Sequence, residues 1–525
     1  MTAYSTASRL SALVLAFALC GIAPVMVSLA QDITGGSSSE LASAADVESR
    51  SGRGVFTAPK TVAHHARKLE KKTVARVTVT RTQHQTGGQT GTGGGRETGG
   101  GRETNTGGGT DSGLGGPPLG GAARRVADAQ ELNRQGDEAF DAAHYDKAVE
   151  LYQKAIKQKA NYPEAYLNLS EAYFNLGKFN EAAEAAKTAT AQKPDWADAY
   201  TALGNAYLKL DRWADAIEPL KRALTLAPNN TEAKSALSLV YFDQGVDAYN
   251  ANKNDEAIAA YQQAIAVKYD YAEAYNNLGD AYRRQEKFAE AADAYKKAVQ
   301  YKSDYADAYG NLAWMYDKLG KLPEAVEAYR QATRLKPDDA EANNNMGYAL
   351  GKLKRWTEAV APLQRAIQLK PDYAEAYSNL GWVYNNLGKL NEALAPLKKA
   401  AELNPNLAEA YFNIGITYSR LKQKDEALAA SKRAVELKSD WPAAQNNLGF
   451  AYGQLGKWKE AIAAHQEAIR LKPDYAGAHF NLGFAYLNSG NKKAAIEEYN
   501  ALKPLSLGLA NQLYFFIYKK QPPKG

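Results

Sequence analysis

The feature that most constrains this chain is a 34-residue period that runs through most of its length. When the sequence is aligned on a recurrent Leu-Gly pair, nine of the ten spacings between units are 34 residues and one is 41. The units begin at Ala129, Pro163, Ala197, Ser238, Ala272, Ala306, Ala340, Ala374, Ala408, Pro442 and Ala476. A period of this length indicates one structural unit stacked many times, because each unit buries its apolar face only against its neighbours.

Within each unit, apolar residues recur at spacings of three and four. Small residues occupy positions 8, 20 and 27, large residues occupy positions 4, 7, 11 and 24, and proline is frequent at position 32. In the unit that begins at Ala374 these are Gly381, Ala393, Ala400, Tyr377, Leu380, Tyr384, Leu397 and Pro405. The spacing predicts two amphipathic helices with a turn between them, ended by proline.

These landmarks, together with the recurrent Gly-Lys-x-x-Glu-Ala segment, resemble the tetratricopeptide repeat. The resemblance implies an all-α, right-handed superhelical solenoid of about eleven helix–turn–helix repeats, preceded by a disordered N-terminal region. An apolar helix within 504–520 is expected to cap the last repeat. The expected divisions are three repeats in 129–230, an irregular fourth repeat with a seven-residue insert in 231–271, and repeats five to eleven in 272–509.

The first 30 residues are typical of an export signal. Arg9 precedes an apolar run over 10–30, and the Ser28-Leu29-Ala30 segment places small residues, Ser28 and Ala30, at the spacing that a signal peptidase requires. At 21 residues the run could also remain as a membrane anchor. Either outcome predicts export to the periplasm or cell envelope, and the single cysteine of the chain, Cys20, lies inside the run.

Two further segments separate this signal from the repeats. Residues 31–86 are mostly polar and include a basic stretch, 50–81, with nine Lys or Arg against one Glu. This stretch could contact an anionic envelope component, or it could be a solvated spacer. Residues 87–121 are rich in Gly and Thr and are expected to be a flexible linker.

Charge and motifs argue against enzymes and nucleic-acid binding. Residues 1–125 carry 14 basic and 8 acidic residues, so the formal net charge of +6 belongs to the leader and the repeats are neutral. The repeats contain three histidines, His144, His465 and His479, without a cysteine or a phosphate-binding glycine loop. We expect no catalytic residue, metal, cofactor, nucleic acid or small-molecule substrate.

Candidate partner-binding residues lie on the first helix of each unit, opposite the packing stripe. At 100° per residue, positions 2, 6, 9 and 13 cluster there, and the resemblance places this face in a concave groove. Asn recurs at position 6, and the candidates there are Asn311, Asn345, Asn379, Asn413, Asn447 and Asn481. Position 9 changes from Asp137, Glu171, Asn205, Val246 and Asp280 to Trp314, Tyr348, Trp382, Ile416, Phe450 and Phe484. Position 13 adds the cations Arg284, Lys318, Lys352 and Arg420.

The face has two interpretations. Asn amides could bond a peptide backbone while the aromatic side chains form pockets and the cations take an acidic group. Alternatively, the Asn residues fix the packing between repeats and the aromatic residues cover a neighbouring helix. The sequence therefore predicts a non-enzymatic scaffold that binds a protein or extended peptide. An envelope-anchoring protein and an accessory subunit of a transferase or secretion complex are the alternatives.

Overall fold

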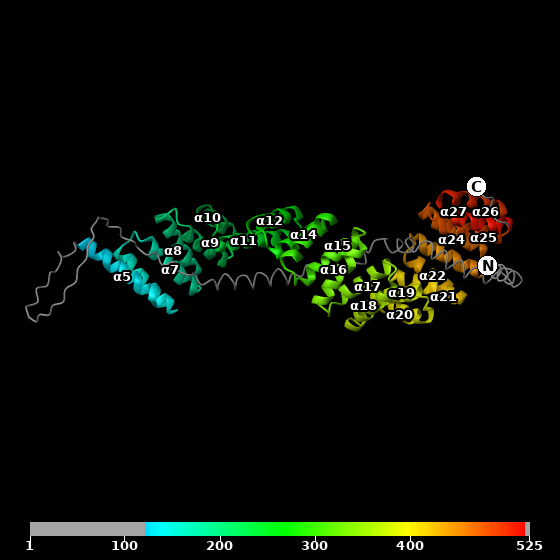
Figure 1. Ribbon diagram of the computed structural model, residues 1–525, viewed down its shortest axis with the longest axis horizontal. Coiled ribbons are helices and arrows are strands. Elements are labelled where there is room, and N and C mark those ends of the chain that lie inside the picture. Colours follow the sequence, from blue (N-terminus) through cyan, green and yellow to red (C-terminus); the bar gives the residue numbers. More distant parts are fainter. Residues whose placement is uncertain (1–120, 520–525) are drawn as a thin grey trace, which may run out of the picture. The chain divides into compact units, whose positions relative to one another are not determined.

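The structure is a computed structural model that describes residues 121–519. The predictions for 1–30, for 31–86 with its basic stretch, and for nearly all of the linker lie outside these residues. The described residues form 23 α-helices, without a strand among them, which confirms the expected all-α fold of consecutive helix pairs (Figure 1). They fall into two compact units, which divide between residues 285 and 286.

The first unit begins with a long helix, α5 (Gly121–Asp141), and then alternates first and second helices of successive repeats. Each helix packs mainly against its immediate neighbours in the chain. The remaining helices of this unit are α6 (Tyr145–Gln158), α7 (Pro163–Asn175), α8 (Phe179–Gln192), α9 (Ala197–Lys209), α10 (Trp213–Leu226), α11 (Thr231–Asn250), α12 (Asn254–Val267) and α13 (Ala272–Arg284).

The second unit continues the alternation and ends with an additional helix. Its helices are α14 (Phe288–Tyr301), α15 (Ala306–Lys318), α16 (Leu322–Leu335), α17 (Ala340–Lys352), α18 (Trp356–Leu369), α19 (Ala374–Asn386), α20 (Leu390–Leu403), α21 (Ala408–Arg420), α22 (Lys424–Leu437), α23 (Pro442–Gln454), α24 (Trp458–Leu471), α25 (Ala476–Asn488), α26 (Lys492–Leu505) and α27 (Leu507–Tyr518).

The interior of each repeat is set by the small residue at position 8. A Cβ atom added at Gly381 would lie 2.3 Å from Leu397 Cγ on the second helix, and one added at Gly204 would lie 2.5 Å from Leu220. Both leucines are fully buried. Glycine therefore lets the two helices of a repeat approach until the leucine at position 24 covers the backbone of the first helix.

Position 15 lies two residues after the end of the first helix in every repeat. The backbone there is left-handed, with φ of +76° at Gly388 and +74° at Gly177. In six repeats a residue other than glycine adopts the same conformation, including Lys354 and Asp211 with φ of 59° and 57°. The turn geometry is thus common to all repeats, and the six non-glycine residues carry the steric cost of that conformation.

Two first helices are longer than the regular 13 residues. Helix α11 has 20 residues, and its additional residues begin at Thr231, where the sequence departs from the period. Helix α5 has 21 residues and begins eight residues before the start of the first repeat. At the other end, Ala510, Leu513 and Ile517 of α27 are buried against α25 and α26, so α27 caps the last repeat as expected.

Candidate functional site

The large apolar side chains at position 9 lie on six successive first helices of the second unit, from α15 to α25. All six are half-buried, so each keeps part of its surface accessible to a ligand. We call them the apolar row: Trp314, Tyr348, Trp382, Ile416, Phe450 and Phe484.

Trp382 packs against the preceding repeat. Its ring centroid lies 5.8 Å from that of Tyr348 and 5.1 Å from that of Trp356. A Cβ atom added at Gly351 would lie 2.4 Å from the same indole ring, so glycine leaves the space that the ring fills. These contacts support the interpretation that Trp382 covers a neighbouring helix, while its role in partner binding stays a prediction.

The other aromatic members of the row differ in their contacts with the rest of the chain. Phe484 lies edge-on to Phe516 of the capping helix, with ring centroids 5.3 Å apart. Trp314 has the ammonium of Lys318 at 5.5 Å from its ring centroid. Within residues 121–519, Phe450 has no ring–ring contact. Phe450 is therefore the member whose accessible ring surface is best placed to be tested for ligand binding.

The Asn residues at position 6 join consecutive first helices. Asn379 donates from Nδ2 to Asn344 Oδ1 at 2.9 Å, and Asn481 donates in the same way to Asn446 Oδ1 at 3.1 Å. The acceptor in both cases is position 5 of the preceding repeat. These bonds support the packing interpretation of the Asn residues. Each bond uses one of the two amide hydrogens, so the remaining capacity of the amide can still serve a ligand.

The other Asn residues at this position vary in burial and bonding. Asn447 donates to Ser431 Oγ at 3.0 Å, and Asn345 accepts from Asn344 Nδ2 at 3.1 Å. Asn311 and Asn413 are buried, with exposed fractions of 5% and 8%. The backbone oxygen of Asn413 accepts a bond from Asn385. The candidate amides therefore do not form one uniform exposed ladder.

Two of the three cations at position 13 of the second unit are engaged by the preceding repeat. Arg420 donates from Nη1 to the backbone oxygen of Asn385, and burial lowers the pKa of its guanidinium. Lys352 pairs with Asp317 at 3.3 Å. Lys318, whose contact with Trp314 is given above, completes the cations of the second unit.

Arg284 belongs to the first unit and also contacts the preceding repeat. Its guanidinium lies 3.3 Å from the ring centroid of Tyr249, and Nη1 donates to the Tyr249 backbone oxygen at 2.6 Å. The expected recognition of an acidic ligand group by position 13 is therefore not favoured by these contacts, because Arg284, Lys352 and Arg420 are held within the chain.

Position 9 of the first unit is polar in four of its five repeats, the exception being Val246, and polar side chains there form hydrogen bonds. Asp137 Oδ1 accepts from Asn168 Nδ2 and from the buried Tyr152 hydroxyl, both at 2.9 Å. Asn205 donates to Glu232 at 2.7 Å, and burial raises the pKa of that carboxyl. Asp137 and Asn205 thus bond to the following repeat or the following helix, whereas Asp280 accepts from Arg283 of its own helix at 3.2 Å.

Sequence reasoning missed a buried polar junction between repeats 10 and 11. His465 occupies position 24, where most repeats have leucine or tyrosine, and its Nδ1 lies 2.9 Å from Asn446 Oδ1. Asn446 Oδ1 also accepts from Asn481, so Nδ1 is the protonated nitrogen that donates. Burial lowers the pKa of His465 to about 3, which keeps the ring neutral. Histidine at a position where no other repeat has one was the available signal.

Residues 121–519 contain neither a cluster of metal ligands nor a membrane-spanning helix. No group of three or more His, Cys, Asp or Glu side chains there is arranged to hold a metal ion. In the same residues, no helix has the length and apolar character needed to span a bilayer. The expected signal or anchor at 10–30 lies outside them.

Comparison with known structures finds many matching chains. YrrB, described as a TPR protein with an unusual peptide-binding site, is 28% identical, covers 35% of this chain and 95% of its own, and has a TM-score of 0.32. MamA is 30% identical over 32% of this chain and 92% of its own, with a TM-score of 0.30. Yeast Tom70 is 17% identical over 74% of this chain and 95% of its own, with a TM-score of 0.35. No curated protein sequence matches.

Family models match along the repeats. Models of the tetratricopeptide repeat match residues 139–206, 197–230, 242–308 and 408–440. A further model, described as TPR repeat, matches residues 315–354, 352–388, 383–422 and 451–490. Together these matches span more than half of the chain, and they coincide with the helix pairs of both units. The chain belongs to the tetratricopeptide-repeat proteins.

Proposed function

We propose that the second unit binds an extended peptide segment of a partner protein along the apolar row. Tetratricopeptide repeats are scaffolds for protein–protein interaction and are generally not enzymes, so a binding surface is the function to look for. The observation that carries the proposal is that six successive repeats present a large apolar side chain at one register, each half-buried. Large apolar groups that stay accessible in succession are a common mark of a binding surface.

The contacts of the second unit also specify the chemistry of the segment. Lys352 is paired with Asp317, and Arg420 with the Asn385 carbonyl, so these cations already have partners. A segment with apolar side chains and little charge therefore suits the row better than an acidic one. The Asn amides beside the row can bond a peptide backbone with their remaining donor and acceptor capacity.

The test begins with a peptide selected on the full chain from a random display library. The double variant Trp314→Ala, Phe450→Ala should weaken its binding at least tenfold, because both rings retain accessible apolar surface. Trp382 and Phe484 are left unchanged in this variant, because their contacts with neighbouring rings also support the fold.

The matched control changes the same register in the first unit. Glu171→Ala, at position 9 of repeat 2, should leave the affinity within twofold, and circular dichroism should show full helix content in each variant. Equal affinity of the wild type and the double variant would refute the proposal. So would a selection that yields no binding peptide.

We also propose that the chain is exported. The apolar run at 10–30 and the Ser28-Leu29-Ala30 segment support this proposal, and both lie outside the described residues. Sequencing of the mature N-terminus after expression in a bacterial host should give Gln31. A protein that keeps its own first residues and stays in the cytoplasm would contradict export.

A further inference from the structure

Repeat 2 contains an open pocket between α7 and α8. Its volume is about 410 Å³, and the lining includes Tyr166, Tyr173, Glu181, Glu184, Thr188 and Leu169. We call it the repeat-2 pocket. Two tyrosine rings and two carboxylates thus share one space, which is large enough for a small organic group.

The corresponding space in repeat 9 is occupied by the chain itself. Thr188 is position 26, where several other repeats have a long side chain, and in repeat 9 this residue is Arg433. The guanidinium carbon of Arg433 lies 5.9 Å from the ring centroid of Tyr411, the counterpart of Tyr166. Thr188 is too short to reach that ring, and its Oγ1 donates instead to the Glu184 backbone oxygen at 2.9 Å. Repeat 2 therefore has the tyrosine ring, Tyr166, but no counterpart of the Arg433 guanidinium.

The second tyrosine of the pocket also lacks a cation from the chain. Its counterparts in repeats 9 and 10, Tyr418 and Tyr452, have the ammonium groups of Lys398 and Lys432 at 5.6 Å and 5.7 Å from their ring centroids. At Tyr173 the equivalent residue is the neutral Gln153, which donates to the phenol oxygen at 2.8 Å. The faces of both rings are electron-rich surfaces that attract a cation.

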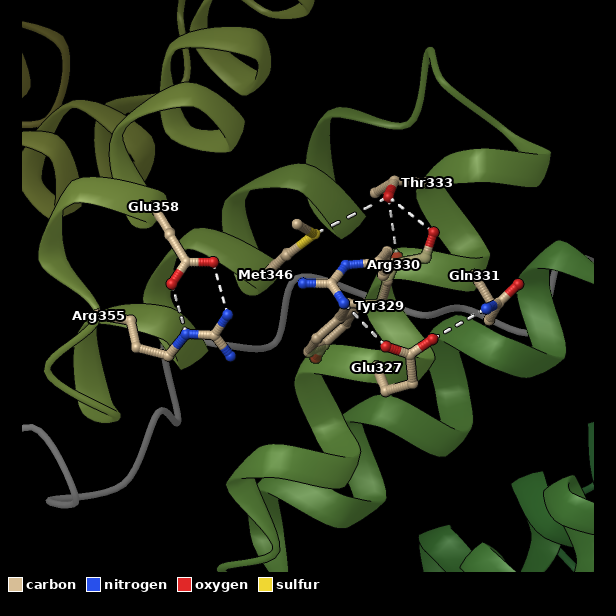
Figure 2. A network of polar contacts seen from close by, with 8 residues as sticks. All are labelled: Glu327, Tyr329, Arg330, Gln331, Thr333, Met346, Arg355 and Glu358. Carbon is tan, nitrogen blue, oxygen red and sulfur yellow. Dashed lines mark hydrogen bonds and ion pairs between the residues drawn. The ribbon is translucent and has the colours of Figure 1, made fainter.

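In several other repeats, the glutamate at position 22 pairs with a cation of the chain. In repeat 6, Glu327 accepts from Gln331 at 2.9 Å and pairs with Arg330 at 3.0 Å, as Figure 2 shows. In repeat 1, Glu150 pairs with Lys154 at 2.5 Å.

The carboxylates of repeat 2 have no such partner. Glu184 is the position 22 residue there, and Glu181 lies one turn before it on α8. Both are exposed, and neither forms a side-chain hydrogen bond or ion pair within residues 121–519. Two negative charges therefore border two tyrosine rings. Arg212 interacts electrostatically with Glu184, but its ion pair, at 2.7 Å, is with Asp215.

We propose that the repeat-2 pocket binds the guanidinium group of an arginine side chain from a partner protein. A guanidinium stacks on aromatic rings and donates paired hydrogen bonds to carboxylates, and the pocket offers both kinds of surface. The arrangement of Arg433 over Tyr411 shows that this repeat geometry accommodates a guanidinium in that position. The pocket lies in the first unit, so the proposal is independent of the apolar row.

The experiment uses acetyl-arginine amide as the probe, titrated into the full chain and followed by ligand-observed NMR. The wild type should show saturable binding. Thr188→Arg should weaken that binding at least tenfold, because the new side chain restores the repeat 9 arrangement and fills the pocket. Arginine also has a high helix propensity, so the substitution suits α8.

Two controls separate the pocket from general charge effects. Ala191→Arg adds the same residue to an exposed position of α8 outside the pocket and should leave the affinity within twofold. The neutral analogue acetyl-citrulline amide has nearly the same shape and should bind at least tenfold more weakly than the arginine probe. The proposal is overturned if the wild type shows no saturable binding, if Thr188→Arg binds as the wild type does, or if the citrulline probe binds equally well.

Discussion

The junction between repeats 1 and 2 and the junction between repeats 7 and 8 are built at the same helix register from different chemistry. In the first, the Asp137 carboxylate accepts from Asn168 of the next repeat and from Tyr152 of its own repeat. In the second, the Trp382 ring packs on Tyr348, Trp356 and the glycine backbone of the preceding repeat. Position 9 contributes to a junction between repeats in both places, toward the following repeat for Asp137 and toward the preceding repeat for Trp382. The chemical type of the side chain decides whether its contacts are hydrogen bonds or ring packing.

The largest expected effect is at the aromatic junction. Trp382→Ala should lower the free energy of unfolding of the second unit by about 3 kcal/mol, because it removes ring packing and leaves a space beside Gly351. Denaturant titration followed by circular dichroism measures the loss, and hydrogen exchange should locate it in α17, α18 and α19. If Trp382→Ala lowers the free energy of unfolding by less than Asp137→Ala, the expected difference between the aromatic and the polar junction is wrong.

The next effect is a pH dependence confined to the second unit. His465 has its pKa lowered to about 3 by burial, against an ordinary value of 6.5 when unfolded. The buried, neutral ring therefore makes its full contribution to the free energy of unfolding above pH 6.5. This contribution is lost as the pH falls from 6.5 toward 3. At pH 5 the loss should be about 2 kcal/mol.

His465→Leu is the matched variant for this prediction, because it restores the leucine found at position 24 of repeats 3, 7 and 8. The free energy of unfolding of this variant, measured between pH 7 and pH 5, should fall less steeply than that of the wild type. Equal slopes would show that the ring titrates normally.

The polar junction should be weaker. Asp137→Ala leaves the Tyr152 hydroxyl and the Asn168 amide without this acceptor, at a cost of about 1.5 kcal/mol. Asp137→Asn keeps an acceptor oxygen and serves as the control, with a smaller loss. Chemical denaturation of the wild type and the two variants ranks their free energies of unfolding. A larger loss for Asp137→Ala than for Trp382→Ala would reverse the comparison of the two junctions.

The smallest effect should be equal in the two units, because the turn after the first helix is the same in both. Asp211→Gly and Lys354→Gly place glycine at a positive φ and should each stabilise by about 0.5–1 kcal/mol. Thermal melting of each variant measures the gain. Effects of opposite sign in the two units would mean that the turns differ as well as the junctions.

The period predicted the helices closely. Nine of the eleven repeat starts, from Pro163 to Ala476, are the first residues of first helices. The two exceptions, α5 and α11, extend upstream where no proline or turn residue stops them. Helix formation depends on local spacing and on residues that end helices, and both are visible in the sequence.

The contacts of the candidate site were less predictable. A helical wheel shows that Asn379 and Trp382 point away from the partner helix of their own repeat, and this alone makes them candidates for ligand binding. It does not show that the first helix of the preceding repeat lies beside that face, where Asn344 and Tyr348 meet them. Contacts between repeats depend on how helix pairs stack, which one repeat's pattern does not encode.

The most direct test of the proposed binding surface is hydrogen exchange of the full chain with and without the selected peptide. The peptide should slow exchange in first helices of the second unit, above all in α15 and α23, which carry Trp314 and Phe450. The polar first helices α7 and α9 should exchange at unchanged rates. Protection confined to the first unit, or to second helices such as α16 and α24, would contradict binding along the apolar row.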